Sequence, residues 1–305
     1  MPNILVMFKS INAIEFARQF KDNESCYEYL IEKKWGNGYR CIRCGCSESN
    51  KGRTWYYKRC KKCGYDESVT SNTVFHDMKM PILKAFHLAF RISSKKKGMS
   101  TVELGNEVGV QQKTAWLFKR KLQEIMRDKK RLRGNVQLDE TIWGGHVKGK
   151  EHRGRSLKKK SAVVVAAEIL NDGRTGNINF ETIQNFKAAT LKNAIQNMIV
   201  DRAAILTDQM QSYEFLKNEI KIETVKSEYG TAMKEIHKQI MLFKIWLRGT
   251  HHKCSKALLG KYLDEYKFRF NNRNRRHLIF DILIKQLICC SPQPYAVLSK
   301  CELNT

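Results

Sequence analysis

The 305-residue chain has no long hydrophobic run, no internal repeat and few acidic residues. No apolar stretch approaches the roughly 18 residues that a membrane-spanning helix needs, which argues against a membrane protein. The first residues form a short apolar stretch without a basic start or a cleavage-like site, so we expect no secretion signal. Only 30 Asp and Glu residues oppose 56 Lys and Arg, which leaves a formal charge of +26. This excess predicts a polyanionic partner and favours nucleic acid over an acidic membrane surface.

The chain has ten cysteines, and four of them form two CxxC pairs. A large chain without a secretion signal favours metal ligation in a reducing cytoplasm over disulfides. Cys41 and Cys44 are separated by fifteen residues from Cys60 and Cys63. Each pair can form a tight turn that directs two thiolates to one tetrahedral ion, so the four predict one closed, structural Zn²⁺ site per chain. Cys46 is a competitor for Cys44, although Cys44 has the usual spacing from Cys41.

Composition and periodicity divide the chain into five expected parts. They are an N-terminal helical segment (1–34), a zinc ribbon (35–73), a helical, helix-turn-helix-like region (74–134), a mixed α/β domain (135–274) and a C-terminal helical tail (275–305). The zinc ribbon is rich in Lys and Arg with aromatic residues between them. Contact with DNA is therefore favoured for it, and contact with protein is the alternative.

Residues 100–116 have the pattern of two helices joined by a glycine turn. We expect a small core built from Val102, Leu104, Val108, Val110, Trp116 and Leu122. The second helix would begin with three residues that can read base edges, namely Gln111, Gln112 and Lys113. A plain helical hairpin is the alternative, because two helices with a glycine between them are common.

From about residue 135 the pattern becomes mixed α/β. We predict five strands at 136–142, 162–169, 178–183, 204–208 and 222–225. A helix at 186–199 would separate the third strand from the fourth, and the chain becomes helical again after residue 234. Three strands, a helix, two strands split by a short helical piece and a further helix is the order expected of a ribonuclease-H-like core. Periodicity alone supports only a mixed α/β class.

Two aspartates each lie at or near the end of an apolar strand. Asp139 follows a strand-like stretch, and Asp208 closes another. Adjacent strand residues point to opposite faces, so only one of Asp139 and Glu140 can line a site. We choose Asp139, because Gly144 and Gly145 suit a turn that leaves the site. Two such carboxylates suit a pair of divalent ions that activate water or a hydroxyl against a phosphodiester.

His237 and Lys244 lie seven residues apart on a predicted helix and therefore share one face. The imidazole could complete the metal site, although imidazole favours softer ions than Mg²⁺. Lys244 would then face a substrate phosphate as a point charge. Glu235 is the nearest carboxylate alternative to His237, but it lies about 200° round the helix from it. Glu228 is a more distant alternative.

Two long motifs resemble those of a group of bacterial insertion-sequence transposases. One starts at Leu138 with LDETIWGGHVKGK and continues to Arg155, and the other runs from Lys244 to Arg273. The resemblance covers roughly residues 20 to 273. It implies a zinc ribbon and a helical DNA-binding region followed by a DDE-type catalytic domain with a ribonuclease-H-like, retroviral-integrase-like mixed sheet.

By this resemblance, Asp139 and Asp208 match the two catalytic aspartates, and Lys244 matches the characteristic lysine. The third acidic position falls on His237, and related subgroups place Glu, Asn or His there. The variant is thus Asp-Asp-His-Lys. The resemblance implies two catalytic Mg²⁺ or Mn²⁺ ions held by Asp139, Asp208 and His237.

The implied activity is binding of terminal inverted repeats, followed by metal-dependent DNA cleavage and strand transfer. Basic residues of the two motifs would contact DNA, namely Lys148, Lys150, Arg153, Arg155 and Arg248. We expect double-stranded DNA as the partner, a homo-oligomer on that DNA, and a bacterial cytoplasmic, nucleoid-associated location. Two alternatives remain, a DNA-binding regulator with an inactive catalytic domain and a nuclease of the same fold that does not join DNA.

Overall fold

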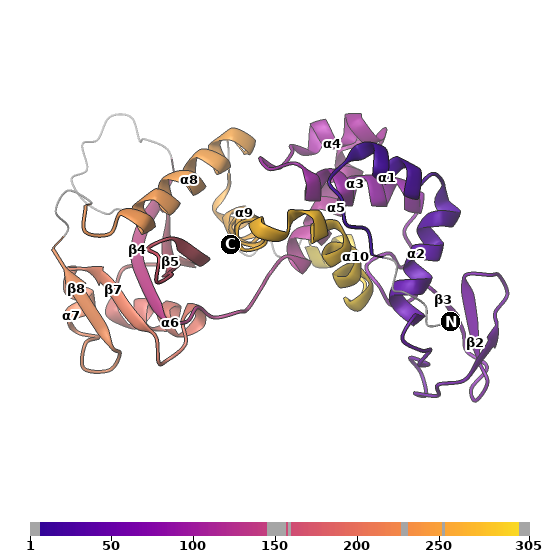
Figure 1. Ribbon diagram of the computed structural model, residues 1–305, viewed down its shortest axis with the longest axis horizontal. Helices are drawn as coiled ribbons and strands as arrows, with labels where there is room; N and C mark the ends of the chain where they lie inside the picture. Colours follow the sequence, from indigo (N-terminus) through magenta and orange to yellow (C-terminus); the bar gives the residue numbers. More distant parts are fainter. Residues whose placement is uncertain (1–6, 145–156, 158–159, 227–230, 252–253, 299–305) are drawn as a thin grey trace. The chain divides into compact units, whose positions relative to one another are not determined.

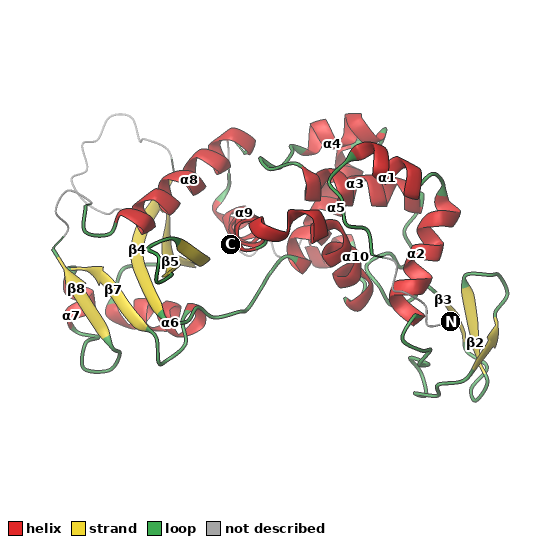
Figure 2. Cartoon of the chain, in the orientation of Figure 1, coloured by secondary structure: helices red, strands yellow, loops and turns green. Residues whose placement is uncertain are grey.

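The computed structural model describes residues 7–144, 157, 160–226, 231–251 and 254–298, and the chain divides into two compact units (Figure 1). The first unit comprises Met1–Met126 and Asn274–Asn304, and the second comprises Arg127–Arg273. Within the described ranges, no helix has the length and apolar character needed to cross a membrane. Figure 2 shows that helices make up most of the first unit and that the larger sheet lies in the second.

The first unit is a helical body with a small sheet. Its helices are α1 (Ala13–Gln19), α2 (Asn23–Trp35), α3 (Ile82–Ser94), α4 (Thr101–Val108), α5 (Gln112–Ile125) and α10 (Ile279–Cys289), with the 3-10 segment η1 (Arg273–Leu278) before α10. α10 packs against α2, α3 and α5. Phe280 of α10 contacts the rings of Phe16, Phe20 and Phe90. The core of this unit therefore combines both ends of the chain.

The small sheet of the first unit has three antiparallel strands in the order β1-β2-β3. They are β1 (Ser49–Lys51), β2 (Tyr57–Cys60) and β3 (Asp66–Ser68). Strands this short contribute little core of their own. Four cysteines gather at one end of this sheet, as described below.

The second unit is a mixed sheet with helices on both faces. Its strands are β4 (Asn135–Trp143), β5 (Ser161–Ile169), β6 (Thr175–Ile183), β7 (Ala204–Asp208) and β8 (Ile222–Val225), and its helices are α6 (Ala188–Met198), α7 (Gln211–Glu214), α8 (Lys234–Thr250) and α9 (Lys256–Asn271). The strand order is β6-β5-β4-β7-β8, with β4, β5 and β6 antiparallel and β7 and β8 parallel to β4. The predicted ribonuclease-H-like order is confirmed.

Side-chain alternation in β5 shows how the sheet is covered. Ala162, Val164 and Ala166 pack towards α6, while Val163 and Val165 pack towards α8 and α9. All five are fully buried. A strand covered on both faces has a continuous apolar run, and the strand predicted at 162–169 agrees with β5 except for its first residue.

Candidate functional site

Asp139 lies in the middle of β4, the central strand of the mixed sheet, and Asp208 is the last residue of the neighbouring strand β7. The parallel pairing of β4 with β7 ends at Gln137 and Leu206, and each aspartate follows two residues later on its own strand. Leu206 packs against the core beneath α8, and the side-chain oxygen of Gln137 accepts a hydrogen bond from the N–H of Ile236 at the start of α8. Because side chains alternate along a strand, both aspartates project towards the α8 face.

Helix α8 places its polar face beside Asp139. The Nε2 atom of His237 lies 3.2 Å from Oδ2 of Asp139, and both side chains are partly buried. Lys244 follows two turns later on the same face. Burial lowers the pKa of Lys244, as does the neighbouring Arg248, while Asp139 opposes the shift. His237 therefore contacts Asp139 directly, and Lys244 lies close enough to Asp139 for the carboxylate to affect its pKa.

Arg248 lies one turn beyond Lys244 on the exposed side of α8. Its guanidinium is 5.9 Å from the ring centre of Trp143 at the end of β4. A cation that packs on an aromatic ring keeps its charge available to an anion. Arg248 thus extends the positive charge of the α8 face beyond Lys244.

Asp208 is held at the start of α7, where its Oδ1 accepts a hydrogen bond of 3.2 Å from the N–H of Met210. In the part of the chain that the structure describes, Asp139, Asp208 and His237 do not form a group whose donor atoms all lie within 4.8 Å of one another. Asp139 and Asp208 offer carboxylate oxygens, which are hard ligands of the kind that Mg²⁺ and Mn²⁺ prefer, and His237 offers an imidazole nitrogen.

The neighbouring carboxylates face elsewhere. Glu140 points to the opposite face of β4, where its Oε1 accepts a hydrogen bond from the hydroxyl of Tyr213. Glu235 accepts a 2.8 Å hydrogen bond from the hydroxyl of Thr175 on β6. Glu228 lies outside the described residues. Sequence reasoning did not anticipate the contact between Glu140 and Tyr213, since no motif connects them.

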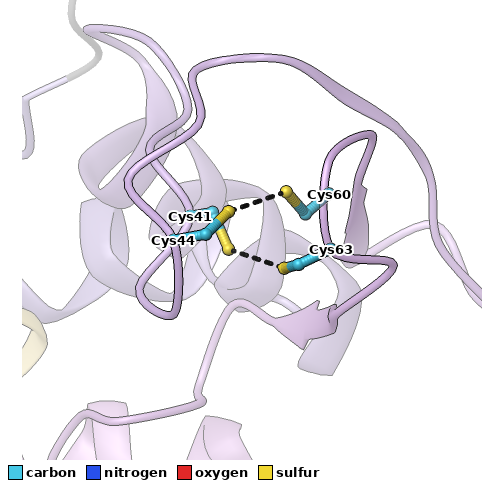
Figure 3. A group of neighbouring side chains, drawn as sticks. All are labelled: Cys41, Cys44, Cys60 and Cys63. Atoms are coloured by element: carbon cyan, nitrogen blue, oxygen red, sulfur yellow. Dashed lines mark hydrogen bonds between the residues drawn. The ribbon is translucent and has the colours of Figure 1, made fainter.

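The four predicted zinc ligands converge in the first unit. Their sulfur atoms all lie within 4.8 Å of one another. Figure 3 shows Cys41 and Cys44 on one loop facing Cys63 and Cys60, respectively, on the other. The sulfur–sulfur distances are 3.6 Å for Cys41–Cys63 and 3.5 Å for Cys44–Cys60. Such a set of four thiols matches the tetrahedral ligand group of a structural zinc ion.

The two cysteine loops have the same backbone form. Gly45 donates its N–H to the carbonyl oxygen of Cys41, and Gly64 does the same to Cys60. Both glycines have φ near +70°, at +72° and +69°, a conformation that side chains disfavour. Burial opposes ionisation of Cys41, but N–H groups that point at its sulfur lower its pKa to about 6. Backbone N–H groups also lower the pKa of Cys60. The N–H of Cys46 acts on Cys44 in the same direction, but burial and the hydrogen bonds with the other thiols raise the pKa of Cys44.

Cys46 lies outside the four-thiol group. Its sulfur donates to the carbonyl oxygen of Glu48 at 3.8 Å. The competition between Cys46 and Cys44 is thereby decided in favour of Cys44, whose sulfur contacts Cys60.

The segment with the helix-turn-helix pattern folds as two short helices. Ser100 caps α4 by accepting the N–H of Glu103, and Gly109 ends it with φ +66°. Helix α5 begins at Gln112, and the three residues that we expect to read DNA are exposed there, namely Gln111, Gln112 and Lys113. Leu104 and Leu122 are fully buried, but Val102 is 52% exposed, so its prediction as a core residue was wrong. It falls on the outer face of a helix of only eight residues.

Most of the basic segment predicted to contact DNA after β4 lies outside the described residues. Lys148, Lys150, Arg153 and Arg155, together with Gly145, lie outside the described residues. Gly144 is described and has φ +144°, which suits glycine at the turn that leaves β4.

One match to a known protein family lies within the second unit. Residues 131–271 match the model of the ISXO2-like transposase domain. No curated protein sequence matches the chain. The crystal structure of the Mos1 strand transfer complex is 13% identical, with a TM-score of 0.31, and the alignment covers 65% of this chain and 75% of that chain. A pre-cleavage Mos1 transpososome is 12% identical, with a TM-score of 0.29, and the alignment covers 68% of this chain and 74% of that chain.

Proposed function

Because the chain carries an ISXO2-like transposase domain at residues 131–271, we propose that it is an insertion-sequence transposase that binds terminal inverted repeats, cleaves DNA and transfers the cut strand. The observation that carries this proposal is the approach of His237 to Asp139 on the face where Lys244 also lies. All three residues fall within the matched domain. Two side chains that can bind a metal ion, next to a positively charged lysine, suit cleavage of a phosphodiester, because metal ions and the lysine both stabilise negative charge on the phosphate oxygens.

In this proposal, Asp139, Asp208 and His237 hold two Mg²⁺ or Mn²⁺ ions. Such ions lower the pKa of an attacking water and stabilise charge on the attacking and leaving oxygens. Lys244 contacts a phosphate oxygen of the substrate as a point charge. Water first attacks the phosphorus at the element end, so that a new P–O bond forms and the P–O3′ bond breaks. The element end then carries a 3′-hydroxyl, and the flanking strand carries a 5′-phosphate. That hydroxyl then attacks a phosphodiester of the target, so one bond forms as another breaks and no covalent protein intermediate arises.

DNA recognition is assigned in this proposal to the first unit. The four-thiol group of Cys41, Cys44, Cys60 and Cys63 holds one structural zinc ion, which stabilises a module with little core of its own. All three residues at the start of α5 contact DNA in this proposal: Gln111 and Gln112 read base edges, as the second helix of such a motif does, and Lys113 contacts a phosphate. The net charge of +26 supports this assignment, because phosphate neutralisation supplies much of the affinity for DNA. The five parts predicted from the sequence stay a proposal for how these roles are divided, with α10 of the C-terminal part joined to the first unit.

Joining two element ends requires two active sites in one complex, so the proposal includes a homo-oligomer on double-stranded DNA in the bacterial nucleoid. Incubation of the purified chain with labelled element ends and Mg²⁺ or Mn²⁺ tests the function. Joined products would exclude both the regulator and the simple nuclease. Cleaved products without joining would favour the nuclease, and binding without cleavage would favour the regulator. Inverted repeats that flank the gene would supply the substrate.

A further inference from the structure

The backbone pairing between β4 and β7 stops short of the two aspartates. Its last pair is Gln137 with Leu206, and Asp139 and Asp208 each lie two residues beyond it. Main-chain hydrogen bonds between these strands therefore do not fix the distance between the two carboxylates. The ligands of a metal site have to be held in position to within about 0.5 Å. The spacing of Asp139 and Asp208 therefore needs a further contact between the two strands beyond their last backbone pair.

Tyr213 makes such a contact on the α6 face of the sheet, opposite to the face of the two aspartates. Its side chain is fully buried in the core beneath α6. Its hydroxyl donates to Oε1 of Glu140, the residue that follows Asp139 on β4. The hydrogen bond from Tyr213 to Glu140 therefore connects the segment after β7 to β4 beyond the last backbone pair of the two strands.

Tyr213 is also closely linked to Asp208. It lies in α7, and the N-terminal residue before that helix, Met210, donates its N–H to Oδ1 of Asp208. The N–H of Tyr213 in turn donates to the carbonyl oxygen of Met210. A short path of hydrogen bonds therefore runs from Asp208 through Met210 and Tyr213 to Glu140, next to Asp139.

We propose that Tyr213 and Glu140 are positioning residues, whose hydrogen bond sets the spacing of Asp139 and Asp208 and thereby the affinity of the site for divalent metal ions. This inference rests on the proposed function. Glu140 acts as a hydrogen-bond acceptor and not as a metal ligand, because its side chain projects to the face opposite to Asp139.

Tyr213→Phe tests the proposal, because it keeps the buried ring and removes only the hydroxyl. We expect the Mn²⁺ concentration for half-maximal cleavage to rise roughly 10- to 100-fold, the range found when a partner behind a metal ligand is removed. Cleavage at saturating Mn²⁺ and binding of element ends without metal should be retained. An unchanged metal requirement would overturn the proposal.

Ser212→Ala is the matched control. Ser212 lies beside Tyr213 in α7 and also makes one side-chain hydrogen bond, but its hydroxyl donates to the carbonyl oxygen of Phe186 at 2.7 Å. We expect its metal requirement to equal that of the unaltered chain. An equal rise in both variants would show a general loosening of α7 and would overturn the proposal.

Glu140→Gln separates positioning from ligation. The amide keeps an oxygen that can accept from Tyr213, so its metal requirement should remain close to that of the unaltered chain. Complete loss of cleavage at saturating Mn²⁺ would identify Glu140 as a metal ligand and overturn its positioning role.

Direct Mn²⁺ binding by the purified full chain, measured by electron paramagnetic resonance without DNA, separates this inference from the proposed function. If the unaltered chain binds Mn²⁺ but joins no DNA, the function is wrong, and weaker Mn²⁺ binding by Tyr213→Phe still supports the positioning role. Equal Mn²⁺ binding by the two chains overturns that role whatever the cleavage assay gives. An unaltered chain that takes up no Mn²⁺ would overturn both.

Discussion

The imidazole of His237 on α8 lies 3.2 Å from the carboxylate of Asp139 on β4. Helix α8 packs against β4 and β5, so the contact follows from how the helix covers the sheet (Figure 1). Glu235, two residues earlier on the same helix, is directed instead to Thr175 on β6. Of these two residues, His237 is the one that reaches the strand carrying Asp139.

Replacement of His237 by a carboxylate should change which metal supports cleavage. A carboxylate is a harder ligand than imidazole, so His237→Glu should raise activity with Mg²⁺ relative to activity with Mn²⁺. The measurement is the ratio of cleavage rates in the two metals. Glu235→Gln is the control and should leave the ratio unchanged. If the ratio stays constant in His237→Glu and moves in Glu235→Gln, the third ligand is Glu235.

The four-thiol group predicts about one zinc ion per purified chain. Cys60→Ser should lose that zinc, because Cys60 is buried and contacts Cys44. Cys46→Ser should keep it, since Cys46 lies outside the group and contacts the Glu48 backbone. Metal analysis of the three proteins makes the comparison. Full zinc content in Cys60→Ser would refute the assignment.

The lowered pKa of Lys244 predicts an alkaline limit to activity. A lysine is charged below its pKa, so burial and Arg248 make Lys244 lose its charge at a lower pH than an ordinary lysine. Cleavage that needs this charge should fall as the pH rises through that value. Arginine keeps its charge above pH 12, so the residual activity of Lys244→Arg should persist to higher pH. Lys238→Arg, on the exposed side of α8, is the control and should not shift the profile.

Lys113 should contribute to end binding through a phosphate contact. Lys113→Ala should weaken binding to element ends and reduce the salt slope by about 1. Gln112→Ala should reduce the preference for element ends over random DNA, as expected for a side chain that reads a base edge. Lys187→Ala removes an exposed lysine of the second unit and serves as the charge control. Salt-dependent binding curves distinguish the three variants.

Local sequence patterns were sufficient for much of the second unit. The predicted strands at 204–208 and 222–225 agree with β7 and β8 residue for residue. Both are short; β7 ends in Asp208 and β8 is followed by Lys226, and these polar residues mark where the apolar runs stop. β6 begins at Thr175, three residues before the prediction, because its first residues are partly polar and pair with β5 at the edge of the sheet. The cysteine spacing was likewise sufficient for the four-thiol group.

Contacts between distant segments could not be predicted in this way. Phe280 packs with Phe16 and Phe90 from the other end of the chain, and no periodicity connects these rings. The hydrogen bond from Tyr213 to Glu140 depends on the parallel register of β4 and β7, which the sequence does not encode locally. The approach of His237 to Asp139 depends in the same way on the packing of α8 over the sheet.

The most direct test of the account is strand transfer by the purified chain on labelled element ends, with Asp139→Ala and Asp208→Ala alongside. If these carboxylates hold the catalytic metals, the unaltered chain joins ends to target DNA with Mg²⁺ or Mn²⁺, and each variant binds ends but neither cuts nor joins them. Cleavage at the normal rate by either variant would contradict the assignment of that aspartate to the site.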